Sequence, residues 1–276
     1  MSRYAGMSHF NATQETIMSS RRNGFDGISQ LYKDLSLSSG LPTTDETSRL
    51  AAIEDLKACD ASRLETTALL TREAFYAFEH PAIELKALNE LTRTNPTGIA
   101  PILFGLCQRG IGFESFKVCI NYLKENEKDL AIATLIHNSQ RNFKRYSAEQ
   151  LNELGYNDHK PQATQVDRLT QFIADVFSEP DPELLGLKLG TLAFEAASKS
   201  PEIAVPVFYT MLSERKDTTV RLLALDFMER MCLITNTPES RSFLTRVLRE
   251  YKDDPDLNFS VNMKAARLVL TDEQSS

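Results

Sequence analysis

The stretch Lys216-Asp217-Thr218-Thr219-Val220-Arg221-Leu222-Leu223-Ala224-Leu225 decides the fold, because a charged turn leads directly into a helical apolar pattern. Val220 and Ala224 lie one helical turn apart, so they share a face, and the small Ala224 side chain lets another helix approach closely. Recurrence of such a unit predicts helices stacked in pairs. Three further stretches of this kind begin at Ile83, Leu184 and Val261, each after a turn containing Pro or Asp.

Composition favours a globular helical protein. The chain has 276 residues, of which 42% are hydrophobic and 25% charged, with only 11 Gly and 11 Pro. This balance supports a substantial core and favours helix over strand. The formal net charge of −7 argues against binding to nucleic acid or to an anionic membrane surface, since both draw on basic residues.

The cysteines and the apolar runs indicate the environment of the chain. Cys59, Cys107, Cys119 and Cys232 are widely spaced and mostly flanked by apolar residues, which predicts reduced, buried thiols. No apolar run reaches the roughly 18 residues of a membrane span. The N-terminus lacks the apolar core of a secretory signal. These features predict a cytoplasmic protein without a membrane span.

Residues 1–42 differ from the rest of the chain. They are rich in Ser, Thr and Asn, and a linker-like run occupies 36–42. We therefore predict a flexible N-terminal arm. Arg3, Arg21 and Arg22, with little negative charge nearby, leave an organelle presequence or a bacterial export signal as alternatives.

Capping patterns predict helices from residue 43 onward. Ser or Thr followed by Glu or Gln, or by Pro, occurs at 43–46, 62–65, 147–150 and 237–239, and Gly155 suits a helix end. Further helices are expected at about 97–109, 113–124, 127–144, 163–178 and 201–215. The total is about a dozen helices and no strand. The polar run 155–162 divides an N-terminal helical half, 43–157, from a C-terminal helical-repeat half, 158–276, although one continuous domain is also possible.

The segment around Asp217, Val220 and Arg221 resembles the second helix of a HEAT repeat. The intervals from Leu184 to Val220 and from Val220 to Val261 approach the length of such a repeat, about 40 residues. The resemblance covers 181–270 and, loosely, 81–125. It implies an all-α, irregular HEAT/armadillo-like solenoid in which Asp217 and Arg221 help to hold neighbouring units. An irregular helical bundle is the alternative, because Glu84, Leu185 and Asn262 occupy the arginine position elsewhere.

The sequence contains no motif typical of a catalytic, metal or cofactor site. His9, His80, His137 and His159 are isolated, and neither a paired His nor a Cys-x-x-Cys motif occurs. The phosphate loop and the nucleophile elbow are also missing. Asp253–Asp256 contains three carboxylates but lacks the Gly and terminal Glu of an EF-hand. We expect no enzyme activity, no cofactor and no metal. Carboxylates that come together only on folding are not detected by sequence motifs.

The run Arg141-Asn142-Phe143-Lys144-Arg145-Tyr146 combines cations with aromatic rings. Such a run can bind phosphates and stack on bases. The alternative is the C-terminus of a helix, where cations favour the dipole and Phe143 packs inward.

The sequence favours a non-enzymatic helical-repeat scaffold or adaptor that binds another protein, since solenoids expose long faces. One alternative is an exported bacterial effector or secretion regulator, and another is a HEAT-like nucleic-acid-binding or DNA-repair protein. The arm leaves export or an organelle as alternatives to the cytoplasm. Exposed polar positions near the repeat helices are the candidate contact residues: Arg93, Arg141, Lys144, Arg145, Lys188 and Arg221.

Overall fold

The computed structural model describes residues 46–56, 62–76, 80–94, 98–156 and 166–274. Thirteen helices and no strand occur within these residues, which confirms the all-α prediction. The predicted arm, 1–42, lies outside the described residues, as do Thr43 and Cys59. The runs 100–106 and 203–208, which are short enough for strands on periodicity alone, lie in helices.

The chain divides into two compact units, residues 1–61 and 62–276. Within the first unit, helix α3 (Glu46–Asp55) buries Ala52 and Ile53. Residues 43–61 of the expected N-terminal half belong to the first unit, whereas the rest of that half and the expected C-terminal half, 158–276, belong to the second. In chain order, the helices of the second unit are α4 (Arg63–Tyr76), α5 (Pro81–Thr94), α6 (Ala100–Arg109), α7 (Phe113–Asn126), α8 (Lys128–Ser139), α9 (Lys144–Glu153), α10 (Arg168–Ser178), α11 (Pro182–Lys199), α12 (Pro201–Glu214), α13 (Thr218–Thr235), α14 (Pro238–Glu250) and α15 (Asn258–Gln274).

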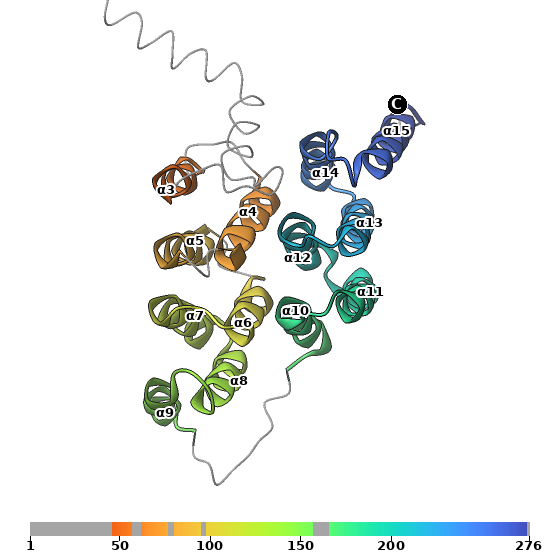
Figure 1. The fold of residues 1–276 in the computed structure, drawn as a ribbon. Coiled ribbons are helices and arrows are strands. Elements are labelled where there is room, and N and C mark those ends of the chain that lie inside the picture. Colours follow the sequence, from red (N-terminus) through yellow and green to blue (C-terminus); the bar gives the residue numbers. More distant parts are fainter. Residues whose placement is uncertain (1–45, 57–61, 77–79, 95–97, 157–165, 275–276) are drawn as a thin grey trace, which may run out of the picture. The chain divides into compact units, whose positions relative to one another are not determined.

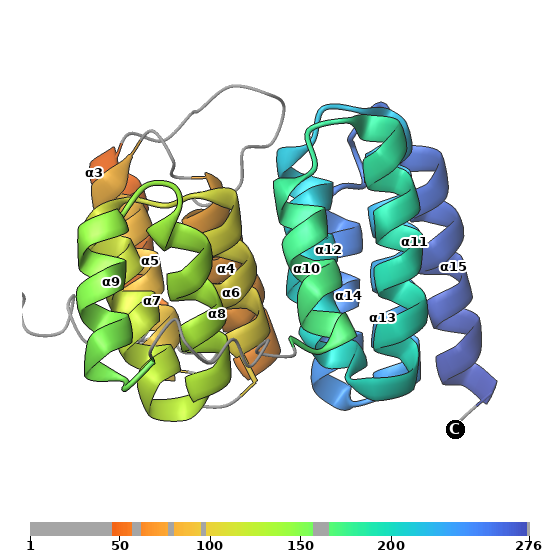
Figure 2. The same ribbon diagram turned by 90° about the horizontal axis from the view of Figure 1, so that it is seen from below.

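The helices of the second unit lie in four rows (Figure 1). The two inner rows are α4, α6, α8 and α10, α12, α14, and they pack on each other mainly where α6 meets α10 and α4 meets α12. The outer rows are α5, α7, α9 on one side and α11, α13, α15 on the other (Figure 2). Each outer row therefore has one side that faces an inner row.

Aspartate and proline residues set the starts of several helices. The Asp181 carboxylate accepts the backbone N–H of Leu184 at 3.0 Å, and the Asp217 carboxylate accepts that of Val220 at 2.9 Å. Thr237 and Ser240 form a reciprocal capping box around Pro238. These contacts satisfy backbone donors that the first helical turn leaves unpaired. They confirm that the turns rich in Asp and Pro begin helices.

The prediction around residues 127–150 is wrong in two respects. Helix α8 ends at Ser139, and α9 begins at Lys144, so Lys144 lies in a first helical turn and not in a last one. Ser147 is buried inside α9 and caps nothing. The reason is the aromatic ring of Phe143, which packs 4.7 Å from the Phe116 ring and fixes where α9 starts. Gly155, at φ +72°, ends α9 as predicted.

The predicted register of α11 is off by one residue. Leu184 is 50% exposed, whereas Leu185 is 1% exposed and begins the buried stripe of Leu185, Leu189, Leu192 and Ala196. The close approach of α13 decides this register, because a side chain added at Gly186 would lie 3.2 Å from Leu223. Ile83, Val220 and Val261 are buried, as the pattern predicts.

The three described cysteines, Cys107, Cys119 and Cys232, are buried free thiols, which confirms their sequence-based prediction. Burial raises the pKa of the Cys232 thiol to about 12. A thiol with this pKa stays protonated at neutral pH and behaves as a small apolar side chain.

Candidate functional site

Exposed apolar side chains gather on one outer row of the second unit. Among the described residues eight large apolar side chains are exposed, and Phe113 on α7 is the one that lies outside this row. Phe194 and Phe259 are 82% and 79% exposed. Such a concentration is typical of an interaction surface, whereas scattered single residues are not. We call the following set the apolar face: Leu184, Leu187 and Phe194 on α11, Leu233 and Ile234 on α13, and Phe259 and Met263 on α15.

The three helices of the apolar face are apolar on two sides. On the side that packs into the protein, α13 buries Val220, Ala224 and Leu225. On another side it exposes Leu233 and Ile234. Packing against α12 accounts for the first set, whereas Leu233 and Ile234 are 43% and 51% exposed.

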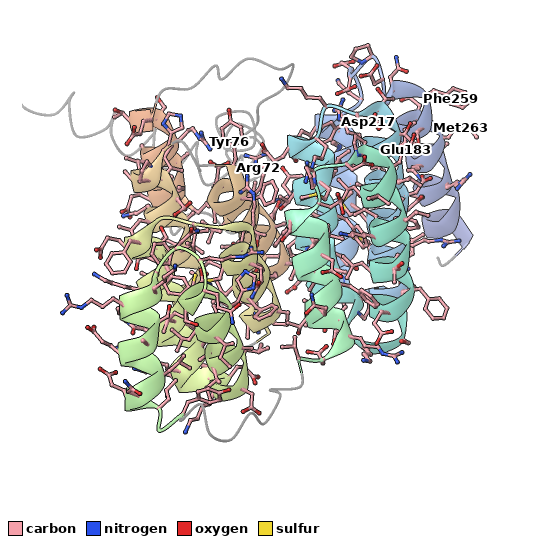
Figure 3. All side chains as sticks on the ribbon, turned by 60° about the horizontal axis from the view of Figure 1, so that its bottom comes forward. Arg72, Tyr76, Glu183, Asp217, Phe259 and Met263 are labelled. Atoms are coloured by element: carbon pink, nitrogen blue, oxygen red, sulfur yellow. The ribbon has the colours of Figure 1, made fainter. Side chains whose placement is uncertain are left out.

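A groove of about 890 Å³ lies between α13 and α15. Phe227 and Leu233 line it on α13, and Phe259 and Met263 line it on α15. Figure 3 labels Phe259 and Met263 on α15. We call this hollow the α13–α15 groove. Its size falls in the range of ligand pockets and of clefts that hold a side-chain cluster.

A second hollow of about 570 Å³ lies between α11 and α13, bordered by Gly190 and Phe194 on α11. Phe227, Arg230 and Leu233 line both hollows, so the two adjoin along α13. Five residues of the apolar face line these two hollows, whereas Leu184 and Leu187 line neither of them.

The charges of the α13–α15 groove are mostly paired. Lys264 on α15 is buried, its Nζ lies 2.6 Å from Asp226 Oδ1, and it also donates to the Glu229 carboxylate. Arg230 is exposed and lines the groove, but it forms no ion pair with any described residue. Arg267 also lines the groove, so the formal charge of its lining is +1, from Arg230, Lys264 and Arg267 against Asp226 and Glu229.

The six contact residues expected from the sequence do not form one surface. Arg93 lies in the last turn of α5 and pairs with Glu90, and Arg145 on α9 pairs with Glu149. Arg141 and Lys144 are exposed around the turn from α8 to α9. Lys188 lies on α11, where it pairs with Glu179. These positions belong to both outer rows (Figure 1).

Arg221 differs from its expected exposed position. Its side chain is 13% exposed, its Nε donates to the Leu212 carbonyl, and its Nη2 lies 2.5 Å from Asp254 Oδ2. Asp217 caps its own helix and does not pair with Arg221. Arg221 therefore ties α13 to the turn between α14 and α15, and it is held by intramolecular contacts.

The basic and aromatic run 141–146 uses its rings for packing. The Phe143 ring lies 4.7 Å from that of Phe116, and the Tyr146 ring lies 5.4 Å from that of Phe113. Rings in such contacts are not free to stack on bases, so this geometry favours the interpretation in which Phe143 packs inward.

A buried polar network joins the two inner rows. Arg72 on α4 is 1% exposed, and it donates to Glu73 Oε1 at 2.8 Å and to the Tyr209 hydroxyl at 3.0 Å. The Tyr209 hydroxyl donates to Glu250 Oε2 at 3.2 Å. Arg246 on α14 also pairs with Glu65 on α4. Sequence reasoning did not anticipate this convergence of α4, α12 and α14.

Burial shifts the pKa values in this network. It raises the pKa of the Glu250 carboxyl from its ordinary 4.5 to about 7, although Arg72 and the Tyr209 hydroxyl favour the charged form. Burial likewise raises the pKa of Tyr209. For Arg72, burial lowers the pKa, but Tyr209, Glu73 and Glu250 outweigh that effect and the pKa ends above its ordinary value. Arg72 and Glu73 are each 1% exposed, so their charges face other side chains and not solvent.

Glu250 makes the stability of the fold depend on pH. Because its folded pKa is raised, the carboxyl contributes stability that is fully present below about 4.5 and is lost as pH rises through about 7. We expect Glu250→Gln to remove this contribution. When the pH rises from about 4.5 to about 7, the urea midpoint of the variant is therefore expected to fall less than that of the parent. Glu149→Gln, at an exposed carboxylate, is the control and is expected to keep the parent profile. Identical profiles for Glu250→Gln and the parent would contradict the assignment.

Comparison with protein-family models finds no match, and comparisons with curated proteins and with solved structures find none either. Within the described part of the chain, no helix is long and apolar enough to cross a membrane. The same residues contain no group of three or more His, Cys, Asp or Glu side chains placed to hold a metal ion.

Proposed function

We propose that the chain is a helical scaffold or adaptor that binds another protein through the apolar face. The observation that carries this proposal is the gathering of seven exposed apolar side chains on α11, α13 and α15. Removing such side chains from water is the main favourable contribution to protein association. The likeness to HEAT repeats, which also use extended helical faces, remains part of the proposal.

The apolar face has the composition of an interface centre. Phe194, Phe259 and Met263 are large and exposed, and aromatic residues and methionine are enriched at the centres of interfaces. The basic run at 141–146 offers less apolar area, because its rings pack on α7. The apolar face is therefore the better candidate for a protein contact.

Substitution of two exposed phenylalanines tests the proposal. We expect Phe194→Ser with Phe259→Ser to weaken partner binding at least tenfold, a loss of about 1.4 kcal/mol or more, while stability changes little because both rings are exposed. Immobilised parent and variant proteins are compared by quantitative mass spectrometry of the proteins that they retain from cell extract. Binding strength is then measured with each purified candidate.

Arg141→Ser with Lys144→Ser is the matched control, since both side chains are exposed and lie around the turn from α8 to α9, outside the three helices of the apolar face. The proposal requires partners that the control retains and the phenylalanine variant loses. If the phenylalanine variant retains every partner of the parent, the apolar face is not the binding surface.

A further inference from the structure

We infer that the α13–α15 groove binds an amphipathic helix of a partner protein, with an acidic side chain of that helix placed against Arg230. This inference rests on the proposed function, because it names the kind of partner that the apolar face accepts. It states what occupies the groove, how the occupant binds, and which charge the occupant carries beside Arg230.

The length of the groove fits a short helix. Its lining residues on α15 run from Phe259 to Leu268. At about 1.5 Å per residue this span is roughly 14 Å, or about two and a half helical turns. A helix that lies in such a groove inserts side chains at positions i, i+3 or i+4, and i+7, which span about 10 Å and so fit within this length.

The walls of the groove suit apolar anchors. Phe227 and Leu233 form one wall, and Phe259 and Met263 form the other. Phe259 and Met263 are four residues apart, so they lie on one side of α15 and face the same occupant. The flexible Met263 side chain adapts to the shape of an inserted residue.

The groove charges select an acidic helix. Lys264 is already paired with Asp226 and Glu229, so it does not require a partner. Arg230 lines both the groove and the adjoining hollow. It is exposed and has no ion pair with a described residue. An occupant that covered Arg230 with apolar atoms alone would desolvate a charge without compensation. A carboxylate at that point offsets this cost.

A second copy of the chain fits the groove less well. In a two-fold symmetric dimer this surface faces its own copy, so two groove linings that each carry a formal charge of +1 would meet. The charges therefore favour a different protein with an acidic, amphipathic helix.

Two designed peptides test the inference. Both are helix-forming, labelled peptides of about 18 residues with leucine at helical spacing, and they differ by Glu or Lys beside the leucine face. We expect the Glu peptide to bind about tenfold more tightly than the Lys peptide in fluorescence anisotropy. Amide exchange is expected to show protection in α13 and α15. Arg230→Glu is expected to reverse the preference, and Met263→Glu to weaken binding of the Glu peptide.

Arg141→Glu is the matched control, since it makes the same charge reversal at an exposed arginine outside the groove. It is expected to leave the preference for the Glu peptide unchanged. Equal binding of both peptides, no binding of either, or an unchanged preference in Arg230→Glu would overturn the inference. A dimer in sedimentation analysis that Phe259→Ser dissociates would assign the groove to a second copy and overturn it too.

The two proposals fail in different ways. If partner binding is lost in the phenylalanine variant but unaffected by Arg230→Glu, the apolar face binds protein and the acidic-helix inference is wrong. If the phenylalanine variant keeps all partners, the proposed function itself is wrong.

Discussion

Arg72→Met is expected to lower the free energy of unfolding by about 3–5 kcal/mol, the range typical for removing one partner of a buried ion pair. The guanidinium of Arg72 binds Glu73, contacts the Tyr209 hydroxyl, and lies 4.0 Å from Glu250. Without it, two buried carboxyl groups from α4 and α14 lose their shared cation. Urea denaturation measured with parent and variant at the same pH gives the difference directly.

Arg93→Met is the matched control for Arg72→Met. Arg93 also pairs with a glutamate, but its side chain is largely exposed, so we expect a change below about 0.5 kcal/mol. Combining Arg72→Met with Glu73→Gln is expected to cost less than the sum of the two single changes, because each removes the charge that the other leaves unpaired. Similar stability of Arg72→Met and the parent would show that the network does not hold α4 against α12 and α14.

Ala224→Glu is expected to destabilise the fold by a few kcal/mol. Ala224 is fully buried on α13, which packs against α11, α12 and α14. A glutamate there adds volume to a close helix contact and either buries a charge or takes up a proton. Chemical denaturation is expected to show a clearly lower midpoint for the variant than for the parent.

Ala266→Glu is the control for Ala224→Glu, since it introduces the same side chain at an exposed helical position on α15. We expect it to change stability by less than about 0.5 kcal/mol. Asp226 is unsuitable as a neutral position, because its carboxylate pairs with Lys264. An unchanged midpoint for Ala224→Glu would contradict the packing of α13.

The candidate face was only partly visible in the sequence. The excess of leucine around α11 was a usable signal, because Leu184, Leu185, Leu187 and Leu189 cannot all point to one side of a helix. Periodicity did not show which of them would be exposed, and Leu184 was assigned to the wrong side. The groove beside Phe259 and Met263 depends on the distance between α13 and α15, which no local pattern encodes.

The expected contact residues were chosen by a rule that the fold does not follow. Exposed cations were expected to mark the binding surface, but Arg221 and Lys188 form ion pairs within the chain. Arg230, which lines the groove and has no ion pair with a described residue, was not among them. Pairing depends on which turns lie side by side, and this is a property of the tertiary structure.

The sequence by itself determined the all-α class, most helix starts and the burial of the described cysteines. These features depend on local chemistry: Asp181 and Asp217 cap the residues that follow them, and helical spacing puts Val220 and Ala224 on one face. Only the tertiary structure decided the Arg72–Tyr209–Glu250 network, the register of α11 and the apolar face. Each of these requires helices distant in sequence to be placed side by side, because a side chain is buried, paired or exposed according to the neighbour that packing supplies.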